Sequence, residues 1–416
     1  MSRVKILFVI ALVSIMAFPV GLAQAQQAVP TSADETFGTV VIWDDAALSD
    51  AVTYSLTGIA APAAGTVLVG WLVSDDGATK LNTGALTVAA DGTVSHTFDS
   101  NSAGYTGENL IAAYDKVVIT SEAEANAAAA SPAGTAVYNH VIPAAGLAHI
   151  RHLLTSWPEG SETGILTDLK SQLDAAIAHA NLAKDSATLE DVLTHTHHVI
   201  NILEGATGAN YDIAFGDPGD GVGAINYAID RKHGPFAVAA VPDDEVIAAG
   251  AALVDITGKN AEDWATEARD IALNSVVPAG SLALAQIFLG PGAGSVISAL
   301  DAARNGYDSN GDGTIASVAG EGGTQQAYVE AQRTATFTLT GGAPGEVEVP
   351  PPDATPTPAP TPTPAPTTPS EPGIGLPSVG DSSIPLLAQI ALIASLVVLS
   401  TGGIILVRTR RPSTRA

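Results

Sequence analysis

The chain has 416 residues, of which 43 are acidic, 17 are basic and none is cysteine. The absence of thiols excludes disulfide scaffolds, cysteine nucleophiles and cysteine-ligated metal sites. A net charge of −26 argues against unaided binding to nucleic acid, which requires a basic surface. The length is sufficient for two or three domains.

The first 25 residues have the pattern of a secretory signal. Arg3 and Lys5 precede an apolar run at 6–20, and the AQA sequence at 23–25 has the form of a cleavage site. The pattern predicts a signal peptide over residues 1–25 and an exported mature chain. An uncleaved N-terminal anchor is the alternative.

Short apolar runs broken by Gly, Pro and Asp follow between residues 36 and 142. Short runs at regular intervals, separated by turn residues, are typical of a β-sandwich. We therefore predict a β-sandwich domain over 36–142. Its expected strands are 39–43, 52–56, 66–73, 84–88, 94–98 and 116–120.

Several positions in this region match one family frame. A Trp strand, an Asp-Gly turn, a strand ending in Thr-x-Glu and a P-x-G turn occur at Trp71, 91–92, 118–122 and 132–134. In these features the region resembles the extracytoplasmic C-terminal domain of anti-sigma-K factors. The resemblance implies a sensor- or adhesion-like sandwich. It does not imply sigma-factor binding, which belongs to a separate cytoplasmic domain in that family.

From about residue 144 the apolar residues recur with a helical period. The pattern predicts an antiparallel α-helical bundle over 144–340. The polar, Gly-rich segment 205–234 is expected to be a long loop. The expected helices are 147–154, 166–180, 189–203, 244–254, 261–276, 282–288 and 296–304.

Histidines are concentrated in this helical region, and two pairs have i,i+3 spacing. Such a pair can bind one metal ion from one face of a helix. On helical wheels, however, His152 and His198 lie nearly opposite the apolar stripes of their helices. We therefore expect structural histidines that hydrogen-bond their neighbours, with a transition metal (Zn, Ni or Cu) or haem site as the alternative. The six residues are His149, His152, His179, His195, His197 and His198.

The sequence DSNGDGTI at 308–315 has the spacing of a calcium loop. Ca²⁺ takes six to eight oxygen ligands, and D-x-N-x-D-G supplies side chains from loop positions 1, 3 and 5. The segment resembles the EF-hand and dockerin loop, although position 12, normally Glu, is Ala319 here. A second acidic stretch at 212–221 lacks this spacing and is a weaker candidate. The predicted calcium ligands are Asp308, Asn310, Asp312, Thr314 and Glu321.

The C-terminal segments predict a membrane anchor. Residues 345–380 are rich in Pro and Thr, which favours an extended stalk. The uncharged apolar run at 384–407 is long enough for one transmembrane helix, and four arginines in 408–416 predict a cytoplasmic basic tail. The LPSVG sequence at 376–380 resembles the sorting signal of sortase-anchored wall proteins. Because Val379 replaces the threonine after which sortases cleave, we expect membrane rather than wall anchoring.

These features together predict a multidomain α+β protein with an N-terminal β-sandwich, a helical bundle, a Pro-rich stalk and one C-terminal transmembrane helix. We expect a bacterial, surface-displayed, membrane-anchored binding, sensing or structural protein. Its helical domain would be stabilised by Ca²⁺, and its partner would be an unidentified extracellular or envelope molecule. The alternative is a His-ligated metal or haem carrier of the cell envelope. The sequence has no HExxH, G-x-S-x-G or Walker motif, so we do not expect an enzyme.

Overall fold

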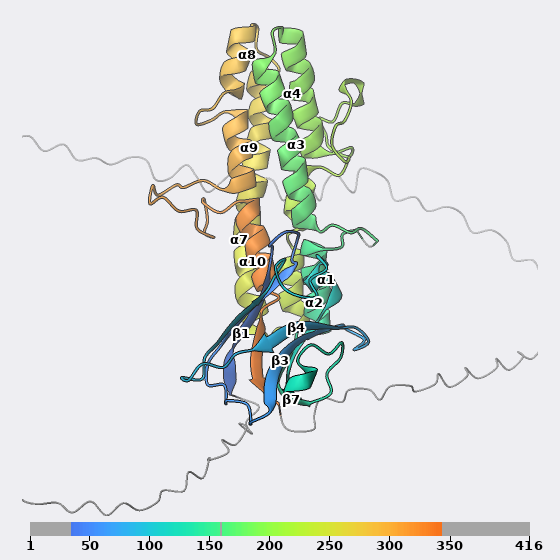
Figure 1. Cartoon of the computed structure of the whole chain (residues 1–416). Helices are drawn as coiled ribbons and strands as arrows, with labels where there is room; N and C mark the ends of the chain where they lie inside the picture. The colour runs from blue at the N-terminus through green and yellow to red at the C-terminus, as the bar shows by residue number, and fades with distance from the viewer. Residues whose placement is uncertain (1–34, 159, 343–416) are drawn as a thin grey trace, which may run out of the picture. The chain divides into compact units, whose positions relative to one another are not determined.

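Eight strands form one antiparallel sheet in the computed structural model, which describes residues 35–158 and 160–342 (Figure 1). Their order across the sheet is β4-β3-β6-β7-β8-β1-β2-β5. Seven strands precede the main helices, and β8 follows them. The strands are β1 (Thr36–Trp43), β2 (Ala51–Leu56), β3 (Thr66–Val73), β4 (Lys80–Leu86), β5 (Val94–Phe98), β6 (Lys116–Ala123), β7 (Thr135–Val141) and β8 (Phe337–Gly341).

The edge strands β4 and β5 approach each other and nearly close this sheet into a barrel. His96 Nε2 on β5 donates to the carbonyl oxygen of Thr83 on β4, at 2.7 Å. The hydroxyl of Thr83 also hydrogen-bonds that of Tyr54 on β2, again at 2.7 Å. Approach of the two edges reduces the row of unpaired backbone groups that an open edge would present.

The predicted β-sandwich is therefore wrong. A sandwich packs two separate sheets face to face, whereas here β8 pairs with both β7 and β1 and joins the strands into one sheet. Gly38 on β1 lies beside the bulge in the β1–β8 pairing and has a φ of +117°. A side chain there would place its Cβ 2.3 Å from the carbonyl oxygen of Ser55, so only glycine fits.

The helical region is inserted between two neighbouring strands, β7 and β8. The first helix of the insertion begins two residues after Ile142, and its last helix ends shortly before β8. A further short helix, α1 (Leu110–Ala113), connects β5 to β6. The inserted helices are α2 (Ala144–Leu154), α3 (Ile165–Asp185), α4 (Leu189–Glu204), α5 (Ala224–Asp230), α6 (His233–Ala240), α7 (Glu245–Ile271), α8 (Leu282–Leu289), α9 (Val296–Asn305) and α10 (Thr324–Arg333).

Two parts of the helical region differ from the sequence prediction. The segment 205–234, expected to be a loop, contains α5 and the start of α6. The predicted helices 244–254 and 261–276 are one continuous α7, followed by a π-helical turn at Ala272–Val276. Gly258 lies within α7, where its missing side chain leaves room for Arg231, whose Cδ would lie 2.5 Å from a Cβ there.

Polar contacts fasten the helices to the sheet. Arg151 on α2 makes a bidentate ion pair with Asp75 in the β3–β4 turn, at 2.5 and 2.8 Å. At the other end of the insertion, the Tyr328 hydroxyl and the Gln332 amide of α10 both donate to Asp44, at 3.0 and 2.5 Å. One apolar cluster extends across the sheet and the helices. The first and last helices are therefore held against the strands that they connect.

In the described parts of the chain, no helix is long and apolar enough to cross a membrane. The two longest, α3 and α7, carry charged side chains along their exposed faces. This finding contradicts the prediction of a single-pass membrane protein that has the membrane as its partner. The segment expected to span, 384–407, lies outside the described residues, as do the predicted signal peptide (1–25), stalk (345–380) and tail (408–416).

We expect Phe337→Ala to destabilise the sheet and the helices together. Phe337 on β8 is fully buried in the shared apolar cluster, and truncation of a buried Phe costs about 3–5 kcal/mol. Hydrogen exchange measured by mass spectrometry should accelerate in β1 and in α10 alike. The control is Val141→Ala at the exposed end of β7. Faster exchange in the strands alone would contradict a shared core.

Candidate metal centres

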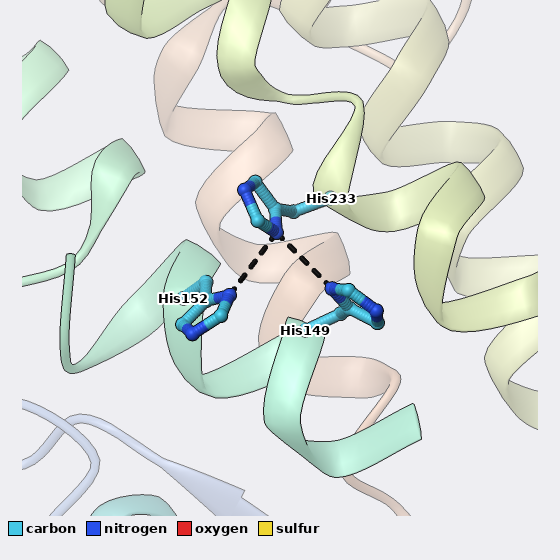
Figure 2. A group of neighbouring side chains, drawn as sticks. All are labelled: His149, His152 and His233. Carbon is cyan, nitrogen blue, oxygen red and sulfur yellow. Dashed lines mark hydrogen bonds between the residues drawn. The ribbon is translucent and has the colours of Figure 1, made fainter. Parts of the chain in front are cut away.

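Three histidines converge where α2 meets α6. His149 and His152 lie one turn apart on α2, and His233 is the first residue of α6. The Nδ1 atom of His233 lies 3.2 Å from Nδ1 of His149 and 3.2 Å from Nδ1 of His152 (Figure 2). His233 is buried and the other two are half-buried. We call this group triad A.

A second group of three histidines lies between α3 and α4. His195 and His198 lie one turn apart on α4, and His179 faces them from α3. The Nδ1 atom of His179 lies 3.3 Å from Nδ1 of His195 and 3.2 Å from Nδ1 of His198. All three side chains are half-buried. We call this group triad B.

The nitrogen spacing in both triads is that of ligands on a single ion. Two nitrogens bound to one tetrahedral zinc, at bond lengths of about 2.0–2.1 Å, lie about 3.3–3.4 Å apart. The four nitrogen–nitrogen distances given above are 3.2–3.3 Å, and all three ligand atoms of each triad lie within 4.8 Å of one another. Each triad can therefore offer three imidazole nitrogens to one ion.

A hydrogen bond at the other ring nitrogen sets which atom of His198 faces triad B. A neutral imidazole has one N–H and one lone pair. In triad B, His198 Nε2 lies 2.6 Å from the carbonyl oxygen of Phe215, which can only accept, so this nitrogen carries the proton. The Nδ1 atom of neutral His198 consequently presents a lone pair to His179. This is the arrangement of a metal-ligating histidine whose other nitrogen donates to a backbone carbonyl.

Asn201 holds the segment that supplies this carbonyl. Its side chain is fully buried on α4 and donates to the carbonyl oxygens of Asp212 and Gly216, at 2.8 and 2.7 Å. Its amide oxygen accepts from the N–H of Asp212 at 2.9 Å. These three bonds bracket Phe215, so Asn201 sets the position of the acceptor that orients His198.

The environment favours neutral imidazoles in both triads. Burial, together with the neighbouring His152 and His149, lowers the pKa of His233 to about 4. Burial is also the largest cause of the lowered pKa of His179 and of His195, with the adjacent imidazoles adding to it. At neutral pH these side chains are uncharged, which is the form that binds a metal ion.

Each triad offers three protein ligands and no fourth among the described residues. Among the described residues, no Asp or Glu joins either group of converging ligand atoms. Structural zinc sites are closed by four protein ligands, whereas sites with three protein ligands keep a position for water or an incoming molecule. The triads belong to the second kind. A haem is less suited to them, because axial histidines bind haem iron on opposite faces of the macrocycle and these three nitrogens converge on one point.

The predicted calcium loop is an exposed loop between α9 and α10. Its oxygens accept hydrogen bonds from the loop itself: Asp308 from the N–H of Gly313 at 2.9 Å, Asn310 from that of Asp312 at 2.8 Å, and Asp312 from that of Thr314 at 2.8 Å. Such bonds stabilise the turn. They do not gather the carboxylates, and the loop belongs to neither group of converging ligands in the described chain.

Glu321 lies beside this loop. Its side chain is buried and accepts from the hydroxyl of Ser309 and from the N–H of Ala316, both at 3.2 Å. Its carbonyl oxygen accepts from the N–H of Tyr307 at 2.8 Å, which closes the base of the loop. Calcium binding by the five predicted ligands stays a prediction.

The acidic side chains of the weaker candidate, 212–221, accept hydrogen bonds from groups close to them in the chain. Asp217 accepts from the N–H of Gly219 at 2.9 Å, and Asp220 accepts from the hydroxyl of Tyr227 at 2.9 Å. Asp212 caps the short helix at Ile213–Phe215. The structural role of this stretch is therefore to support the segment that carries Phe215.

Five of the six triad residues are among the histidines that the sequence offered as an alternative metal or haem site, whereas His233 is not among them. The two i,i+3 pairs and His179 were candidates, whereas His197, the sixth candidate, stacks on the Phe215 ring at 3.8 Å and belongs to neither triad. His233 lay in the segment predicted to be a loop. The available signal was the short apolar run that follows it, 235–240, which forms α6.

Comparisons with protein-family models, with curated proteins and with solved structures find no match to this chain.

We expect Asn201→Ala to weaken metal binding at triad B by about 10–100-fold, the usual cost of losing an outer-shell partner. The segment that carries the Phe215 carbonyl would lose its three anchoring bonds. Metal binding at triad A should be unchanged, as measured by competition with a chromophoric chelator. The matched control is Asn181→Ala, because Asn181 follows His179 on α3 but bonds only its own helix. Equal weakening at both triads would contradict the assignment.

We expect the metal-free protein to lose stability as the pH falls from about 6.5 to about 4. His233 has a lower pKa when folded than when unfolded, so the unfolded chain takes up the proton first and gains relative stability. Melting temperatures of the wild type and of His233→Gln, followed by circular dichroism, test this. The variant should show the smaller decline across the window, and equal declines would contradict the expectation.

Proposed function

We propose that this protein is a two-site transition-metal carrier, with Zn²⁺ as the favoured divalent ion and three histidines at each site. The observation that carries the proposal is the repetition of one arrangement on two separate helix pairs. In both triads an H-x-x-H pair and one histidine from a second helix bring Nδ1 atoms to 3.2–3.3 Å. Hydrogen bonding between core histidines does not by itself require the same arrangement at two separate places.

The chemistry of the ligands limits the choice of ion. Ca²⁺ and Mg²⁺ require oxygen ligands, so nitrogen triads do not suit them. Imidazole suits zinc, copper, nickel and iron, and affinity alone would favour Cu²⁺ over Zn²⁺. The three-coordinate geometry with one open position is common for zinc in proteins. Availability of the ion then decides the occupant.

Reversible binding fits these sites better than a purely structural role. Five of the six ligands are half-buried, so an incoming ligand can reach the ion, and the fourth position is free for exchange. Hydrolysis by a metal-bound hydroxide is the second candidate, because an open zinc site can also activate water.

We expect purified protein to bind two equivalents of Zn²⁺ or Co²⁺. His233→Ala and His179→Ala should each reduce the stoichiometry to one, and the double variant should bind none. Equilibrium dialysis with elemental analysis gives the stoichiometry, and the visible spectrum of bound Co²⁺ reports tetrahedral nitrogen coordination. The control is His96→Gln in the sheet. Unchanged stoichiometry in the double variant would refute the proposal.

A further inference from the structure

The two triads have different surroundings. At triad A, the ring of Trp157 lies 4.6 Å from that of His233 and 5.0 Å from that of His152, between ring centroids. The ring of Phe236 lies 5.5 Å from His233 and 5.8 Å from His149. Two aromatic side chains therefore contact all three ligand rings, and one ligand, His233, is itself buried.

Triad B is surrounded by oxygen acceptors. The Phe215 carbonyl accepts from His198 at 2.6 Å. Asp191 lies one helical turn before His195 on the same face of α4. Asp191 accepts from the hydroxyl of Thr188 at 2.7 Å. Both groups increase the negative potential at the ligands, which stabilises a doubly charged ion.

The acidic side chain that precedes His233 in the sequence is paired with a base. Asp230, three residues before His233, forms an ion pair with Lys232 at 3.0 Å. Triad A thus combines aromatic contacts with little net charge.

We propose that the triads select different ions: triad A binds Cu(I), and triad B binds Zn²⁺. The inference rests on the proposed function, since both triads must hold an ion. The cost of transferring an ion into an apolar environment rises with the square of its charge, so a monovalent ion is favoured where aromatic rings replace water and dipoles. Copper enters as Cu(I) and keeps that oxidation state.

Trp157 is the specificity-determining residue of triad A. Among aromatic side chains, Trp gives the strongest cation–π attraction, which increases when the site is desolvated. Its ring packs against the rings of two ligands, His152 and His233. In triad B, by contrast, the rings of His179, His195 and His198 contact one another, and no other aromatic ring among the described residues contacts them.

The test isolates each triad in the otherwise intact chain. His179→Ala keeps triad A, and His233→Ala keeps triad B. Affinities for Cu(I), supplied anaerobically with a chromophoric Cu(I) chelator as competitor, and for Zn²⁺ are measured on both proteins. The ratio of Cu(I) to Zn²⁺ affinity should be at least about tenfold higher for triad A. Equal ratios would overturn the inference while leaving the proposed function intact, whereas absence of binding to both would refute the proposed function.

A second variant tests the role of Trp157. In the His179→Ala background, Trp157→Leu should lower the Cu(I) affinity by about tenfold and leave the Zn²⁺ affinity within about twofold. Trp264→Leu on α7 is the matched control. Filling triad A with Cu(I) should quench tryptophan fluorescence in the parent and not in Trp157→Leu. Equal changes for both ions would overturn the assignment to Trp157. If Trp157→Leu does not fold, the comparison of the two triads still tests the inference, because it uses only His179→Ala and His233→Ala.

Discussion

In each triad one histidine brings its Nδ1 atom to 3.2–3.3 Å from the Nδ1 atoms of two others, and all three ligand atoms lie within 4.8 Å of one another. In each triad this approach is imposed by helix packing, because α2 packs on α6 and α3 packs on α4 through fully buried residues such as Leu153, Leu173 and Val199. The core thus brings the ligands together before any ion arrives. A preorganised site of this kind loses little freedom on binding, which favours tight coordination.

The insertion of the helices between β7 and β8 connects this chemistry to the sheet. Arg151 lies between the two ligands of α2, and its ion pair with Asp75 ties that turn of helix to the β3–β4 connection. Triad A is therefore positioned partly by the sheet. Triad B lies within the α3–α4 hairpin and is oriented by the segment that Asn201 holds. The two sites have separate supports, which allows each to have its own ion preference.

The local patterns of the sequence predicted most of the strands and helices, but they did not predict which distant segments pair. Alternation and turn residues indicated six of the eight strands, but β8 lies far from β7 along the chain, and no local signal predicts that pairing. The H-x-x-H spacing predicted both histidine pairs. Helical wheels treat one helix at a time, so they do not show that His152 contacts a histidine of α6 and that His198 contacts a histidine of α3. The third ligand of each triad depends on tertiary packing.

A crystal structure of the zinc-loaded protein, with anomalous data collected at the zinc edge, tests the central claim most directly. The account predicts two anomalous peaks, one bonded to Nδ1 of His149, His152 and His233 and the other to Nδ1 of His179, His195 and His198, at about 2.0–2.1 Å. Peaks confined to other residues, or triads that remain hydrogen-bonded without an ion at saturating zinc, would contradict it.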